Sequence, residues 1–152
     1  MPRAAGGLRR GRRGGPSPIR EVTTDRAQER LMTLAASLSV GMYTTTLKAV
    51  ALVKFLEEGS YNLRMRQLIG REDGARRTSL HELTLGLGGH SAKHAHEWDH
   101  QLVVTEGRGL AVVDGKKVPL RPGVVLLVQS GETHQFFQRG KAPMRFLTVT
   151  PI

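Results

Sequence analysis

Four histidines stand out by their type and spacing. His94, His96 and His100 fall within one short stretch, and His134 follows on a later segment. The neutral imidazole ring is the commonest metal ligand among side chains. Three candidate ligands on one segment, with a fourth on a later strand, could surround a single ion in a β-barrel. The sequence therefore predicts a metal centre and leaves the reaction at that centre as a separate question.

The local structure must bring these rings together. If residues 93–96 form a strand, His94 and His96 point to the same face, with Cα atoms ~6.5–7 Å apart. Both rings could then reach one ion at ~2.0–2.1 Å. In a straight strand His100 would lie ~13 Å beyond His96. We therefore expect the chain to bend at residues 97–99 and return on the next strand, with His134 coming from a strand across the barrel.

From residue 47 onward the sequence alternates between apolar runs and turn residues, which favours strands. Asp114-Gly115, between two apolar runs, is a strong signal for a two-residue hairpin. Short strands at spacings of roughly 8–12 residues, with no helical pattern among them, are typical of a sandwich or barrel. The predicted strands are 48–55, 62–69, 79–86, 93–96, 100–105, 109–113, 117–120, 124–128, 134–138 and 144–149.

The N-terminal part has a different composition. Residues 1–24 are rich in Arg and Gly and are expected to form a disordered leader. Residues 25–46 are predicted to form a short helix, over 25–38, and a linker. In the helix Asp25 serves as N-cap, and the apolar side chains fall on one face. Met42 is an alternative start, so residues 1–41 need not belong to the native protein. Residues 47–152 are predicted to be one barrel domain.

The net charge of +10 is uneven, because residues 1–30 hold eight Arg against three acidic residues. A basic leader can bind phosphate loosely. One helix is too little for a helix-turn-helix, however, so we do not expect nucleic acid as a partner.

The most apolar window, 31–56, is interrupted by threonines and by Lys48 and Lys54, so no membrane span is expected. No cysteine is present, which excludes disulfides and thiolate ligands. With no secretion signal, a cytoplasmic location is expected.

Two glycine-rich segments carry the histidines in a recognisable order. They resemble the two motifs of the cupin superfamily, and the resemblance covers about residues 55–150. It implies an all-β, antiparallel jelly-roll barrel (a double-stranded β-helix) with a metal site in its mouth, and a homodimer. In the first motif Gly88 is followed by His94, His96, His100 and Gly107; in the second Gly123 is followed by Gln129, Gly131, His134 and Gln138.

Three positions depart from the family pattern. Gln129 replaces a proline and Gln138 an asparagine, which concerns turn shape. His100 stands where the family usually has a glutamate ligand, and some members resemble this chain in having only histidine ligands. The resemblance thus implies a ligand set of His94, His96, His100 and His134. Four imidazoles leave a divalent ion at +2 instead of +1, which favours anionic ligands and resists oxidation of the metal. We expect one divalent transition metal ion per chain, with Fe, Mn, Ni and Zn as candidates.

Several other side chains are candidates for the pocket. Trp98 lies in the ligand turn, where it could brace the ligands as an apolar plug. Phe136 is two residues from His134 and points to the same face of the predicted strand, so it is expected to line the pocket or to pack in the core. Arg66 could clamp an anion or lie on a charged outer face. Gln101 and Glu82 are possible polar pocket residues. The two remaining histidines, His81 and His90, are expected at the surface or in packing roles.

These features favour a small-molecule ligand at the metal, and two reaction classes fit. The ion could bind a substrate beside dioxygen, as in dioxygenases. It could instead polarise a carbonyl for isomerisation or decarboxylation. Glu82 and Glu97 are the only visible general bases, which weakens the second class. The alternative is a non-catalytic sensing or storage module with the same ligands, because the fold alone suggests a reaction only by analogy.

Overall fold

The computed structural model describes residues 41–152, which form nine strands and two short 3-10 helices. The predicted leader and the helix over 25–38 lie outside the described residues. No helix in the described part of the chain is long and apolar enough to cross a membrane. The elements are η1 (Leu47–Ala49), β1 (Val53–Lys54), β2 (Tyr61–Ile69), η2 (Arg71–Asp73), β3 (Thr78–His90), β4 (His100–Glu106), β5 (Arg108–Val113), β6 (Lys116–Leu120), β7 (Val125–Val128), β8 (His134–Arg139) and β9 (Met144–Pro151).

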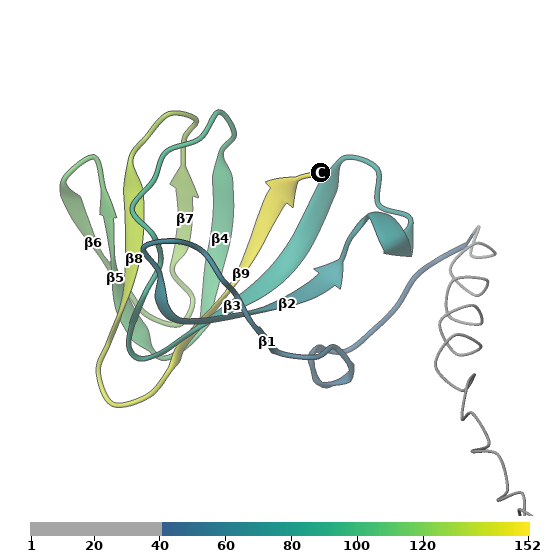
Figure 1. Ribbon diagram of the computed structural model, residues 1–152, viewed down its shortest axis with the longest axis horizontal. Helices are drawn as coiled ribbons and strands as arrows, with labels where there is room; N and C mark the ends of the chain where they lie inside the picture. Colours follow the sequence, from purple (N-terminus) through teal and green to yellow (C-terminus); the bar gives the residue numbers. More distant parts are fainter. Residues whose placement is uncertain (1–40) are drawn as a thin grey trace, which may run out of the picture.

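All strand pairs are antiparallel and form one sheet, in the order β6-β5-β8-β3-β9-β4-β7, with β2 pairing β3 and β1 pairing β2. Strands from opposite ends of this order share one core, because the same buried cluster contains Ala111 and Leu120 as well as Leu102 and Val128. The sheet is therefore curled into an open barrel (Figure 1). The all-β jelly-roll prediction is confirmed.

Most strand ends agree with the sequence prediction to within two residues, although β3 runs on to His90. Two predicted strands are wrong. Over 48–55 only Val53–Lys54 pairs, with β2, because Arg66 Nε donates a hydrogen bond to Val50 O at 2.9 Å and holds the preceding segment beside that strand. Over 93–96 only His94 forms a bridge, to His134.

Side chains of β3 alternate between two environments. Leu83 and Leu85 face the inside of the barrel, where they join the core. Glu82 and Thr84 lie on the opposite face and are also buried. Glu82 forms an ion pair with Arg66 of β2. This pair is outside the barrel, which leaves the inner faces of β2 and β3 apolar around a few polar groups.

Two turns show why the glycines stand where they do. Asp114 and Gly115 both have positive φ, of 45° and 79°, and form the predicted two-residue hairpin between β5 and β6. Gly107, between β4 and β5, has φ +72°, and a Cβ atom there would lie 2.1 Å from Pro143 O. Only glycine fits that position, which fixes the exit of β4, the strand that begins with His100.

Candidate metal centre

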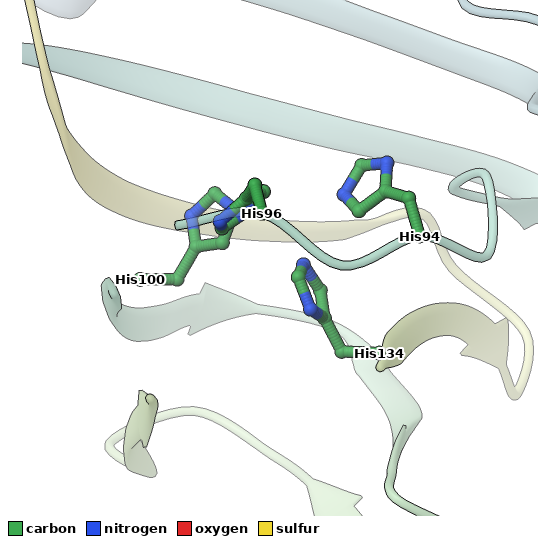
Figure 2. A group of neighbouring side chains, drawn as sticks. All are labelled: His94, His96, His100 and His134. Atoms are coloured by element: carbon green, nitrogen blue, oxygen red, sulfur yellow. The ribbon is translucent and has the colours of Figure 1, made fainter. Parts of the chain in front are cut away.

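The four predicted ligands come together from three places in the chain. His94 and His96 lie on the loop between β3 and β4, His100 is the first residue of β4, and His134 is the first residue of β8. The loop bends at residues 97–98, as the spacing predicts. Figure 2 shows the four rings gathered around one point. Their candidate ligand atoms all lie within 4.8 Å of one another. We call these residues the histidine cluster.

The ligand loop is held by backbone hydrogen bonds to the later motif. His94 N donates to His134 O at 3.2 Å, and His134 N donates to His94 O at 2.9 Å. Gly131 N donates to His96 O at 2.8 Å. Ser130 Oγ donates to Glu97 O at 2.7 Å. The two motifs, distant in sequence, therefore form one rigid frame around the rings.

Each ring is oriented by a partner at Nδ1. His96 Nδ1 bonds to Trp98 O at 2.6 Å, and His134 Nδ1 bonds to Glu132 O at 2.9 Å. His94 Nδ1 lies 3.0 Å from Glu57 Oε1. His100 Nδ1 lies 3.4 Å from Thr148 Oγ1. Ligating histidines almost always bond through their second nitrogen to a carbonyl, carboxylate or water in this way.

These partners determine which nitrogen keeps a lone pair. A backbone carbonyl or a carboxylate can only accept, so Nδ1 of His94, His96 and His134 carries the hydrogen and Nε2 is unprotonated. Nε2 of both His96 and His134 is buried without a hydrogen-bond partner among the described residues. Two imidazole nitrogens on opposite sides of an ion would be about 4 Å apart, twice the usual ~2.0–2.1 Å bond. The candidate ligand atoms, within 4.8 Å of one another, are near that separation. The donor set therefore fits a divalent transition metal ion.

Burial favours the neutral form of two rings of the cluster, His100 and His134. Burial lowers the pKa of His100 to about 3, with further lowering by His96, His134 and His94, and Asp99 opposes the change. Burial also lowers the pKa of His134, against the effect of the hydrogen bond to the Glu132 carbonyl. A ring that stays unprotonated at neutral pH is ready to bind a metal without first losing a proton.

Three residues of the cluster, His94, His96 and His100, line a cavity of about 300 Å³. Trp98 and Phe136 line this cavity, as the sequence suggests. The Trp98 ring stacks on His96, with centroids 4.2 Å apart and planes 4° from parallel, and it is 44% exposed. The structure does not place Arg66 or Gln101 there. Arg66 pairs with Glu82 on the outer face, and Gln101 is exposed beside Asp99.

Five polar residues of the cavity wall are not among the pocket candidates that the sequence suggests, and three of them bear on the chemistry of the site. Glu57 lies in the turn before β2, outside both motifs, and only the fold brings it to His94. Thr148 of β9 reaches His100. His81 of β3 also lines the cavity. His81 is two residues from Leu83 on the same strand, so the two side chains point to the same face. This alternation was the one feature of the sequence that could have placed His81 in the cavity. The two general-base candidates do not line it, because Glu82 is on the outer face and Glu97 is exposed.

The low pKa of His100 makes stability depend on pH. The unfolded chain takes up this proton near pH 6.5, whereas the folded chain does so only near pH 3. Unfolding therefore binds a proton between these values, so the free energy of unfolding falls as the pH drops through this window. Urea denaturation of the metal-free protein at about pH 7.5 and about pH 5.5 should show this loss. In His100→Gln the free energy of unfolding should fall less between these two pH values than in the wild-type protein. An equal fall in both proteins would contradict the account.

Comparisons with known proteins agree with this fold. The cupin domain family model matches residues 81–150. The polyketide cyclase RemF from Streptomyces resistomycificus is 31% identical, with a TM-score of 0.69, and the match covers 73% of this chain and 80% of RemF. A sugar phosphate isomerase of the cupin superfamily from Silicibacter pomeroyi is 25% identical, with a TM-score of 0.61 and coverages of 70% and 74%.

A third solved structure is described as a predicted oxalate decarboxylase, from Thermotoga maritima. It is 22% identical, with a TM-score of 0.64, and the match covers 70% of this chain and 96% of that one. At this identity it shows the fold alone. No curated protein sequence matches the chain. The curled sheet, the two histidine motifs and the match to RemF lead to one conclusion: the chain belongs to the cupin superfamily.

Proposed function

We propose that the histidine cluster binds one divalent transition metal ion per chain and that the ion acts as a Lewis acid on an apolar carbonyl compound. The observation that carries the first part is the set of Nδ1 hydrogen bonds, which leaves the Nε2 lone pairs directed at a common point. Glu57 supports it further. Its carboxylate bonds to His94 and orients that ring, as partners of ligating histidines commonly do.

The second part rests on the cavity wall. Half of its lining side chains are apolar, and none of the lining residues in the described range 41–152 is Lys or Arg. A phosphate or a dicarboxylate would enter without a cationic partner, which is costly away from water. A neutral molecule that carries ketone groups fits better. The apolar lining residues are Phe55, Leu63, Met65, Leu83, Phe136 and Phe146, together with Trp98 and Pro151.

RemF, the 31% identical relative, is named as a polyketide cyclase. Polyketide chains carry ketones on alternate carbons, so the cavity and this relative point to the same chemical class. A divalent ion would supply the polarisation of the carbonyl groups. Four neutral imidazole ligands favour this role over dioxygen chemistry, because they leave the ion its full charge and oppose its oxidation. We therefore favour ring closure of a β-dicarbonyl chain by formation of a carbon–carbon bond.

The second candidate is a non-catalytic binding module that uses the same ligands. It would hold the metal in a site that organic ligands do not reach. The structure favours the open site, because Trp98 at the cavity wall is nearly half exposed. A homodimer, suggested by the family resemblance, stays a prediction, as does a cytoplasmic location.

The ligand assignment predicts the metal content of variants. The purified full chain should carry about one metal ion per chain. His96→Ala should abolish that content, because it removes one donor and the stacking partner of Trp98. His90→Ala is the matched control. This ring lies between Tyr61 and Phe137 and is not part of the cluster. Elemental analysis of the purified proteins measures the content, and full metal retention in His96→Ala would refute the assignment.

The open-site assignment predicts binding of a β-diketone. Benzoylacetone should change the visible absorption of the cobalt-loaded protein at micromolar to millimolar concentration. Ribose phosphate and oxalate should bind at least about 10-fold more weakly, since a tenfold difference needs only ~1.4 kcal/mol. A spectrum that none of the three compounds changes would support the sealed binding module instead. Preference for either anion would overturn the assignment to neutral carbonyl compounds.

A further inference from the structure

His81 is the polar group of the cavity wall that no part of the metal site uses. It lies on β3 and lines the cavity with Thr148 and Thr150 of β9. Its Nε2 lies 3.2 Å from Thr150 Oγ1. Its Nδ1 is buried and has no hydrogen-bond partner among the described residues. An N–H left without an acceptor is the rarer case in buried sites. We therefore assign the hydrogen to Nε2, which donates to Thr150, and the free lone pair to Nδ1.

The sheet places His81 across the cavity wall from the metal cluster. His81 pairs with Thr148 across β3 and β9, and Thr148 pairs in turn with Leu102 of β4. The three strands are neighbours in the sheet (Figure 1). Because adjacent strands lie ~4.8 Å apart, the backbones of β3 and β4 are separated by about 10 Å at this level. His100, on β4, also contacts Thr148. His81 and His100 therefore line the same cavity from strands on either side of β9, so an extended carbonyl compound that binds at the cluster would lie along the wall that holds His81.

The other polar groups of the cavity are already engaged. Glu57 bonds to His94 at 3.0 Å, and its second oxygen accepts from Ala92 N at 3.4 Å. Ser91 Oγ donates to Ala92 O at 3.0 Å and accepts from Phe136 N at 2.9 Å. Among the described residues, His81 is therefore the lining side chain outside the cluster that keeps a basic atom free.

We infer that His81 is the general base of the carbon–carbon bond formation, an inference that rests on the proposed function. Nδ1 removes a proton from a methylene carbon between two carbonyl groups. The electron pair of that C–H bond forms the new bond to a carbonyl carbon of the same chain. The π pair of this carbonyl moves to its oxygen, which then takes the proton back from His81. No atom is lost, and nothing is oxidised or reduced.

The protonation state of His81 agrees with this role. Burial lowers the pKa of His81, and the only opposing influence is Glu72 of η2. The other groups around the ring are the uncharged Thr148 and Thr150 of β9 and Gln67, its partner on β2. The ring is therefore neutral at pH 7, so it can accept a proton without first losing one.

The test uses proton exchange, which needs no knowledge of the natural substrate. The probe is the α-methyl derivative of ethyl benzoylacetate, which has one exchangeable proton between two carbonyls. The zinc-loaded full chain in deuterium oxide should replace this proton faster than the metal-free chain, as proton NMR measures. His81→Ala and His81→Gln should lower the zinc-dependent rate by about 100-fold or more. His90→Ala, on the same strand, should leave it unchanged.

Two further readouts separate a base from a packing residue. Both His81 variants should still bind benzoylacetone in the cobalt-loaded form, which also shows that they are folded. Added imidazole should restore exchange in His81→Ala, where the side chain leaves space, more than in His81→Gln. In the metal-free wild-type protein, nitrogen NMR should show a neutral His81 with its hydrogen on Nε2 at neutral pH.

The outcomes distinguish the two proposals. If the wild-type protein exchanges the proton and the His81 variants do so within about threefold of that rate, the assignment of the base is wrong and the proposed function stands. If the zinc-loaded wild-type protein exchanges no faster than the metal-free chain, Lewis-acid action on carbonyls is wrong and the inference falls with it. A charged His81 ring at neutral pH in the metal-free protein would also overturn the inference.

Discussion

The orientation of four imidazole rings by their Nδ1 atoms is the constraint on which the site depends. Each ring has one nitrogen bonded to Trp98 O, Glu132 O, Glu57 or Thr148. For His94, His96 and His134 the partner is an acceptor, so the lone pair lies on the other nitrogen, Nε2. A buried polar atom without a partner costs about 1–3 kcal/mol, and Nε2 of His96 and His134 are such atoms. One cation satisfies all of them at once, so the protein stores, in the metal-free fold, part of the free energy that metal binding releases.

The rest of the barrel serves to keep this arrangement rigid. Gln138, which replaces the motif asparagine, is buried and holds three backbone groups. Its Oε1 accepts from Gly88 N at 2.8 Å, and its Nε2 donates to Gly140 O at 3.1 Å and Ala142 O at 2.8 Å. It thereby links β8, which carries His134, to the strand that leads into the ligand loop.

Much of this could be predicted from the sequence, because the signals are local. Alternation of apolar residues, the Asp114-Gly115 turn and the spacing of the histidines all act over a few residues. The strands from 62 onward follow from them, except the one predicted over 93–96, where only His94 forms a bridge. The strand predicted over 48–55 is mostly absent, because an apolar run does not reveal which strand of the sheet it lies beside. In the structure this segment lies beside β2, where Val50 O accepts a hydrogen bond from Arg66 and only Val53–Lys54 pairs.

Other features depend on sheet register and were out of reach. Arg66 could have faced the cavity or the outside, and its pairing with Glu82 settles the matter only once β2 and β3 are aligned. Glu57 reaches His94 over a long stretch of sequence, through the packing of a turn with no motif of its own. His81 was expected at the surface or in a packing role, because the alternation that puts it on the same face as Leu83 does not say which face lines the cavity. These are the residues that give this chain its own chemistry within the family.

The central claim is that four imidazole nitrogens surround a single ion. X-ray absorption at the metal edge of the zinc-loaded protein tests it most directly, because the spectrum reports the number and type of first-neighbour atoms. The account predicts four imidazole nitrogens at about 2.0–2.1 Å, with the remaining neighbours being water or buffer oxygen. A spectrum with two or fewer imidazole nitrogens per zinc would contradict it.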